Sequence, residues 1–117
     1  MTSTARSPHP LSSAELLLAV QLEQAGIPFE REYRFARPRR WRADFMVNGL
    51  PFPEILVEVE GGSYTGGHKR GKAYESDCEK QNAAMMLGWL VLRFTPAMVQ
   101  DGRAIAVIRA ALERQAA

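Results

Sequence analysis

Two short apolar segments carry acidic side chains where a buried strand normally has none, and this pattern constrains the fold more than any other feature of the sequence. Arg42–Val47 contains Asp44, and residues 54–62 contain Glu58 and Glu60. Valine, isoleucine and phenylalanine favour strands, and the Asn, Gly and Pro between the segments favour a turn, so we expect two neighbouring antiparallel strands. Side chains alternate along a strand, which places both glutamates on one face and the apolar residues between them on the other.

These three carboxylates should meet at one end of a small sheet. Like charges at close range disfavour one another unless a cation or a shared proton compensates them. Oxygen ligands of this kind suit Mg²⁺ or Mn²⁺ rather than zinc. The pattern therefore predicts a divalent-metal site that includes Asp44 and Glu58. The alternative is that these acids pair with Arg42 or Arg93 at the strand ends.

The remaining pattern predicts a single α/β domain. Ser12 and Glu15 have the spacing of a capping box, which indicates a helix that starts at Ser12 and stops at Gly26. The expected elements after this helix are strands at 29–35, 42–47 and 54–60, a helix at 73–87, a strand at 89–94, and a helical region from Pro96. The order is therefore α-β-β-β-α-β-α with a mixed four-stranded sheet, in one domain at 12–117 that follows a disordered leader at 1–11.

Apolar side chains in the helices and in the last strand should form the core. The strand at 89–94 is almost wholly apolar, so we expect it to be buried and parallel to a neighbour. Cys78 should be a small core residue, because free cysteine is usually buried. Further core candidates are Leu16, Leu17, Val20 and Leu22 in the first helix, Met85, Met86, Trp89 and Phe94 later in the chain, and Ile105, Val107, Ile108, Ala111 and Leu112 in the last helical region.

Four motifs follow one another along the chain: Ser12 with Glu15 at a helix start, residues 41–45, residues 57–62, and residues 87–94. Asp44 and Glu58 are 14 positions apart (58 − 44), and Glu60 completes a Glu-x-Glu sequence on the second strand. Together the motifs resemble the PD-(D/E)XK nuclease superfamily, in particular its very-short-patch-repair-like branch of small phage and bacterial endonucleases. The resemblance covers roughly residues 12–112, with Ala43 and Asp44 in place of the Pro-Asp pair.

The resemblance implies a restriction-endonuclease-like fold and a metal-dependent DNA endonuclease, with Mg²⁺ or Mn²⁺ as cofactor and a nicking or structure-directed activity. It implies Asp44 and Glu58 as direct metal ligands, with the backbone carbonyl of Val59 as a third. It also implies that Glu15 helps to hold a metal-bound water. A capping role alone explains Glu15 nearly as well, so both interpretations remain open.

Glu60 occupies the place where the superfamily usually has a lysine, and an acid cannot supply that positive charge. Lys80 and Lys72 are candidates to replace it from the following helix or loop. His68 is a third candidate, because histidine can move a proton near neutral pH. The structural zinc of the very-short-patch-repair enzymes is not expected, since Cys78 is the only cysteine.

Basic residues are concentrated in two segments although the net charge is only +2. Basic surface beside an acidic cluster suits a polyanion, and DNA is the partner that we expect. The alternative is that these arginines are solvated on an edge strand. The predicted DNA contacts are Arg39, Arg40, Arg42, Lys69, Arg70, Lys72 and Gln81.

The longest apolar run near the N-terminus, residues 16–20, is too short to span a bilayer and follows no signal peptide, so we expect a cytoplasmic protein without a membrane partner. A homodimer is expected if the substrate is a DNA junction, because a resolvase needs two active sites. Two other functions are considered. One is a noncatalytic DNA-binding module that retains the nuclease fold, and the other is an oligomerisation or packaging component without a nucleic-acid role.

Overall fold

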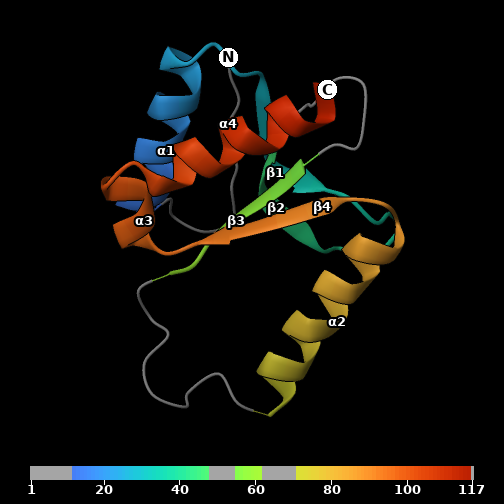
Figure 1. Cartoon of the computed structure of the whole chain (residues 1–117). Coiled ribbons are helices and arrows are strands. Elements are labelled where there is room, and N and C mark those ends of the chain that lie inside the picture. Colours follow the sequence, from blue (N-terminus) through green and yellow to red (C-terminus); the bar gives the residue numbers. More distant parts are fainter. Residues whose placement is uncertain (1–11, 48–54, 62–70, 117) are drawn as a thin grey trace.

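The computed structural model describes residues 12–47, 55–61 and 71–116 and shows an α/β arrangement (Figure 1). The elements are α1 (Ser13–Gln24), β1 (Phe29–Arg34), β2 (Arg42–Val47), β3 (Ile55–Val59), α2 (Lys72–Met86), β4 (Leu90–Phe94), α3 (Pro96–Gln100) and α4 (Arg103–Ala116). The α/β class and the mixed four-stranded sheet are confirmed. The leader expected at 1–11 lies outside the described residues.

The four strands lie side by side in the order β1-β2-β3-β4. The first three form an antiparallel meander, and β4 runs parallel to β3 because α2 carries the chain back across the sheet. β4 is an edge strand, and Leu90, Val91 and Leu92 are only half-buried. The expectation of a buried last strand was therefore wrong, since one side of β4 has no neighbouring strand in the described sheet.

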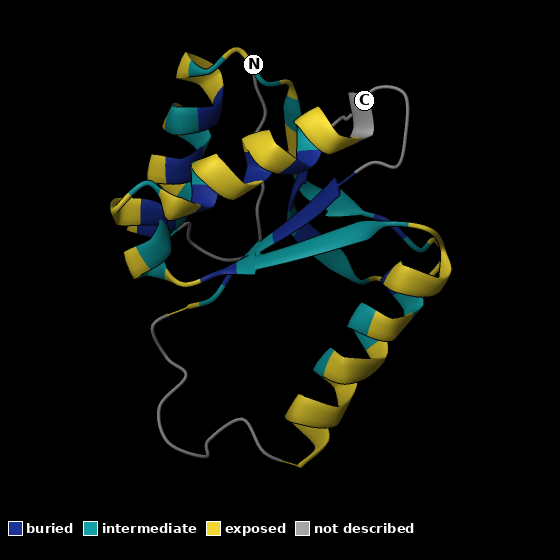
Figure 2. Ribbon diagram, in the orientation of Figure 1, coloured by how far each residue is buried: buried dark blue, intermediate teal, exposed yellow. Residues whose placement is uncertain are grey.

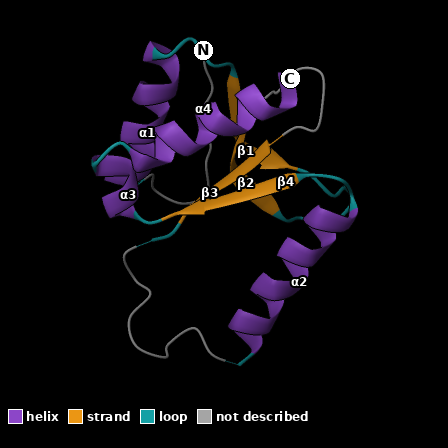
Figure 3. Ribbon diagram, viewed as in Figure 1, coloured by secondary structure: helices purple, strands orange, loops and turns teal. Residues whose placement is uncertain are grey.

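One face of the sheet carries the main apolar core. Helices α1, α3 and α4 cover this face, as Figures 1 and 3 show. Ile55, Val57 and Val59 of β3 point into the core, so the predicted alternation along that strand is confirmed. Leu18 and Ile108 reach the same core from α1 and α4 with no exposed surface.

The opposite face is covered by α2 and has a smaller core. Met46 and Leu56 lie there against Ala84, with half-buried aromatic side chains such as Tyr33 and Trp89 around them. Ala84 is the only buried side chain of α2, and most of that helix is coloured as exposed in Figure 2. A broad apolar face therefore does not hold α2 on the sheet, and polar contacts of its side chains contribute instead.

Several core predictions were wrong because the helices present different faces. In α1 the buried stripe is Ala14, Leu18 and Leu22, four residues apart, whereas Leu16 is 49% exposed and Val20 46% exposed. Other side chains expected in the core but found exposed are Leu17, Cys78, Met85, Met86 and Val107.

The last helical region differs from the expected single helix. Gly102, with φ of 89°, separates α3 from α4 in a left-handed conformation that favours glycine. At the N-terminus of α1, the Ser12 side chain accepts a hydrogen bond from the Glu15 backbone N–H, so the predicted cap is confirmed.

Candidate functional site

β2 and β3 separate at the residue where the first acid occurs. Their ladder pairs Phe45–Val47 with residues 55–57. Beyond it, Oδ2 of Asp44 accepts a hydrogen bond from the backbone N–H of Val59 at 2.7 Å. The carboxylate thus takes the place of a backbone acceptor, and this bond fixes Asp44 at the open end of the sheet.

The side chains of β1 change faces of the sheet at the residue opposite Asp44. The β1–β2 ladder pairs Arg31 with Phe45 and Tyr33 with Ala43, and Glu32 lies between them with φ of 53°. Arg31 places its guanidinium 4.9 Å from the ring of Phe45 in the main core, whereas Tyr33 packs on the opposite face. Residues two apart on a regular strand share a face, so the left-handed conformation of Glu32 is the point at which the alternation of side chains along β1 is broken.

Three acids converge at this break in the alternation of β1. One carboxylate oxygen each from Glu15, Glu32 and Asp44 lies within 4.8 Å of the others. Glu15 therefore combines its position in the helix cap with a place beside Asp44, and this geometry is compatible with both interpretations of Glu15. Glu32 was not predicted as a site residue, and only its register opposite Asp44 in the hairpin could have identified it.

The acid cluster is partly compensated by arginines. Nη2 of Arg31 lies 3.5 Å from Oε1 of Glu15, and Nη1 of Arg42 lies 3.3 Å from Oε1 of Glu32. Burial raises the pKa of Asp44, and the hydrogen bond from Val59 opposes this shift. A cluster of carboxylate oxygens with partial charge compensation fits a hard divalent cation such as Mg²⁺ or Mn²⁺.

Glu58 lies on the α2 side of the same opening and is paired with a lysine. Nζ of Lys80 is 2.8 Å from Oε2 of Glu58, and both side chains are about four-fifths buried, with 21% and 19% exposed. Burial raises the pKa of Glu58 to about 7, and the negative charge of Asp44 adds to this effect while Lys80 opposes it. Of the candidates for a replacement cation that the structure describes, Lys80 and Lys72, Lys80 is the one with an ion pair to a predicted metal ligand.

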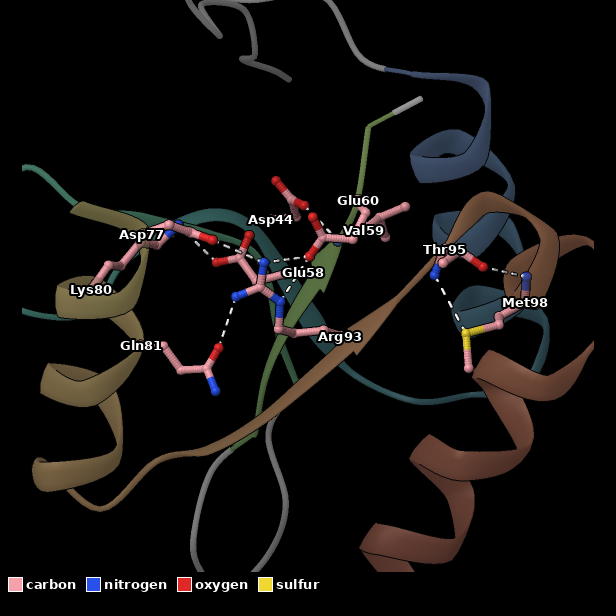
Figure 4. Close-up of polar contacts among 10 residues, drawn as sticks. All are labelled: Asp44, Glu58, Val59, Glu60, Asp77, Lys80, Gln81, Arg93, Thr95 and Met98. Carbon is pink, nitrogen blue, oxygen red and sulfur yellow. Dashed lines mark hydrogen bonds and ion pairs between the residues drawn. The ribbon is translucent and has the colours of Figure 1, made fainter. Parts of the chain in front are cut away.

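Glu60 belongs to a separate network that Figure 4 shows in full. Arg93 of β4 donates from Nε to Oε2 of Glu60 at 2.7 Å, from Nη1 to Oε1 of Gln81 at 2.7 Å, and from Nη2 to Oδ2 of Asp77 at 3.0 Å. Burial alone would lower the pKa of Arg93, but the bonds to Asp77 and Glu60 raise it overall. The network ties β3, β4 and α2 together.

This network changes what can be expected of two predicted site residues. Neither Glu58 nor Glu60 belongs to the cluster formed by Glu15, Glu32 and Asp44, and the partner of Glu60 is Arg93. Arg93 pairs with Glu60 instead of the acids named in the alternative interpretation. Gln81 uses its side-chain oxygen within the protein, so any contact with DNA is left to its amide nitrogen.

The predicted DNA contacts are placed at both ends of α2. The guanidinium of Arg39 lies 3.8 Å from the ring centre of Trp41. Trp41 in turn stacks on Phe35, which is buried in the smaller core. Arg40 is exposed in the same loop, and Lys72 is exposed at the first residue of α2. The predicted contacts Lys69 and Arg70, together with the candidate His68, lie outside the described residues.

A hollow of about 580 Å³ lies beside the arginine network. Its walls come from α2 and the ends of β3 and β4, including Tyr74, Gln81 and Arg93. Cys78 is exposed at this hollow, which explains why it is not in the core. The recess is open to solvent, and neither Asp44 nor Glu58 lines it.

Within the described ranges, none of the helices is both long and apolar enough to cross a membrane. No family model matches the chain, and no curated protein shows significant similarity to it.

Proposed function

We propose that this protein is a metal-dependent endonuclease that hydrolyses phosphodiester bonds in DNA. The observation that carries the proposal is the placement of Asp44 and Glu58 where β2 and β3 separate, with Lys80 at 2.8 Å from Glu58. Two carboxylates and a lysine at the end of a sheet provide the charges that phosphodiester hydrolysis requires. Asp44 and Glu58 belong to two of the four motifs that resemble the PD-(D/E)XK superfamily.

Mg²⁺ or Mn²⁺ is the cofactor that this oxygen-rich site suits. Asp44 holds one oxygen on the Val59 N–H, so its other oxygen remains for a cation. Glu15 and Glu32 contribute oxygens within 4.8 Å. A bound divalent ion would supply a lower pKa for water and neutralisation of charge at the phosphate.

Lys80 supplies the positive charge that Glu60 cannot. Its ammonium group holds Oε2 of Glu58, which leaves Oε1 of that carboxylate as the oxygen available to a ligand or to water. Because the pKa of Glu58 is about 7, this group exchanges a proton in the range where a general base is effective. Lys80 orients that carboxylate and keeps a cation beside the position of a developing negative charge.

The test is cleavage of supercoiled, linear, single-stranded and branched DNA with and without Mg²⁺ or Mn²⁺. Asp44→Asn and Glu58→Gln should each lower the rate at least about 100-fold, since even outer partners of metal ligands cost 10- to 100-fold when they are removed. Asp101→Asn is the matched control, because Asp101 is an exposed acid that pairs with Arg103 away from the sheet. A folded Asp44→Asn variant with full activity would contradict the proposal.

A noncatalytic DNA-binding module is the second candidate function. It is favoured by one observation, that Glu60 stands in the lysine place and is bound to Arg93. In that case the wild type should bind DNA with a salt-dependent affinity and show no metal-dependent cleavage. Absence of both binding and cleavage would leave neither candidate.

A further inference from the structure

We propose that a second hollow, on the edge strand β1, binds a backbone phosphate of the DNA strand next to the bond that is cut. This inference rests on the proposed function. The hollow has a volume of about 440 Å³ and is lined by Glu30, Arg31, Glu32, Tyr33, Arg34, Arg37 and Arg42. It is separate from the recess beside Arg93.

The charges of the hollow favour an anion. Its four arginines and two glutamates give a net charge of +2 (4 − 2). Arg31 and Arg42 are already paired with Glu15 and Glu32. Setting aside these pairs leaves Arg34, Arg37 and the exposed Glu30 on the hollow. The positive charge that remains for a ligand therefore belongs to Arg34 and Arg37, so these two arginines are the expected contacts.

Arg34 is held in place by neutral groups. Its Nη2 donates to the backbone carbonyls of Pro38 at 3.4 Å and Arg39 at 3.1 Å, which fixes the side chain without neutralising it. The buried Nε atoms of Arg31 and Arg34 have no hydrogen-bond partner in the described part of the chain. A fixed guanidinium with unmet charge is suited to phosphate, whose oxygens match its planar donors.

The loop after β1 is also held rigidly. Arg39 stacks on Trp41, and Trp41 stacks on Phe35, so the loop that carries Arg37 is anchored to the smaller core. Arg37 itself is exposed and makes no ion pair within the described residues. A binding surface that is ordered before the ligand arrives loses less entropy when the ligand binds.

The position of the hollow connects it to the acid cluster. Glu32 lines the hollow and also contributes to the acids around Asp44. A DNA strand whose phosphate lies at Arg34 and Arg37 would therefore have its next bond close to the acids around Asp44. The hollow is much larger than a phosphate group, so it accommodates the attached sugar of a nucleotide as well.

The experiment measures DNA affinity against salt concentration, with EDTA present so that no cleavage occurs. Arg37→Gln should weaken duplex binding and make the slope of log affinity against log salt less steep by about 0.9, the value for one lost phosphate contact. Arg109→Gln is the matched control, because Arg109 is an exposed arginine on α4. Inorganic phosphate serves as a second probe and should compete with DNA at the hollow. Only a site for the DNA backbone should also show an affinity that depends on the length of the DNA.

Arg34 separates loss of charge from damage to the loop. Arg34→Gln should reduce the slope as Arg37→Gln does, whereas Arg34→Lys should retain it because the charge remains. Equal reductions in the Gln and Lys variants would overturn the phosphate assignment at Arg34. An unchanged slope in Arg37→Gln, with a wild type that cuts DNA, would overturn the subsite and leave the nuclease standing.

Failure of the proposed function gives different results. Salt slopes that change as expected, in a protein that never cuts DNA with any divalent metal, would support the subsite and contradict the nuclease. A wild type that neither binds nor cuts DNA would overturn both.

Discussion

The two faces of the sheet are attached to their helices in different ways. On one face, α1, α3 and α4 bury apolar side chains such as Leu18, Val57 and Ile108 completely. On the other, α2 buries Ala84 alone and is held by ion pairs from Lys80 and to Arg93. Apolar burial provides most of the free energy of folding, whereas half-buried ion pairs contribute less and depend on geometry. The first face should therefore set stability, and the second should set activity.

The largest effect should come from the apolar face. Leu18→Ala should lower the free energy of unfolding by about 2–5 kcal/mol, because it removes a fully buried side chain from the core. Leu16→Ala is the control on the same helix, and its effect should stay within about 0.5 kcal/mol since Leu16 is 49% exposed. Urea unfolding measures both. Equal losses would show that α1 does not pack as described.

The next effect concerns pH and the α2 face. The folded pKa of Glu58, about 7, is above its ordinary value of 4.5, so the folded state binds this proton more tightly than the unfolded state. Its contribution to stability is complete below pH 4.5 and is lost as pH rises through 7. The loss amounts to about 3 kcal/mol once the pH is well above 7, because each unit of difference between the two pKa values corresponds to about 1.36 kcal/mol.

Glu58→Gln isolates this contribution, because other groups titrate in the same range. In EDTA, the wild type should lose stability relative to the variant between pH 4.5 and 7. Added Mg²⁺ should reverse the trend, since a cation competes with the proton and stabilises the wild type more at pH 8 than at pH 5. Parallel pH profiles for the two proteins would contradict the assignment of Glu58 as a buried carboxyl group.

A smaller effect should follow from loss of the lysine. Lys80→Met should lower the cleavage rate about 10- to 100-fold, as expected for a residue that orients a ligand. The pH dependence of the rate should shift upward, because Lys80 now holds the pKa of Glu58 below the value that burial would give it. Lys80→Arg keeps the charge and should recover part of the rate. A profile that does not move in Lys80→Met would show that the pair has no part in the reaction.

The smallest effect should come from the arginine network. Glu60→Gln removes one charge-assisted hydrogen bond to Arg93 and should cost about 1–2 kcal/mol of stability. Glu60→Lys should cost more, because it places a second cation beside Arg93. Thermal unfolding measures both. A Glu60→Lys variant that is more active than the wild type would show that the superfamily lysine can still work from this position.

The sequence predicted the main course of the chain because its strands and helix ends have strong local signals. Alternation along β3, the cap at Ser12 and the stop at Gly26 were each visible in a few neighbouring residues. In the buried face of α1 only Leu22 was predicted correctly. Leu16, Leu18 and Val20 are similarly apolar, and only the neighbouring helices decide which of them is buried.

The candidate site was predicted less completely than the fold. Asp44, Glu58 and Lys80 were named from strand position and motif spacing, and the structure places them at one opening. Glu32 was missed because its place beside Asp44 depends on the register between β1 and β2. It also depends on a left-handed backbone conformation at Glu32 that no local pattern indicates. Glu60 was expected to meet Asp44 and Glu58 at one end of the sheet, and only the tertiary contact shows that its partner is Arg93.

β1 has a further consequence for the behaviour of the protein in concentrated solution. An edge strand offers unpaired backbone groups to any other strand, and such edges promote aggregation. β1 is protected twice, because Glu32 interrupts its regular conformation and charged side chains such as Arg31 and Arg34 line it. Another strand that paired with this edge would have to follow the irregular backbone and bury these charges, so the features that serve the site also hinder growth into intermolecular sheets.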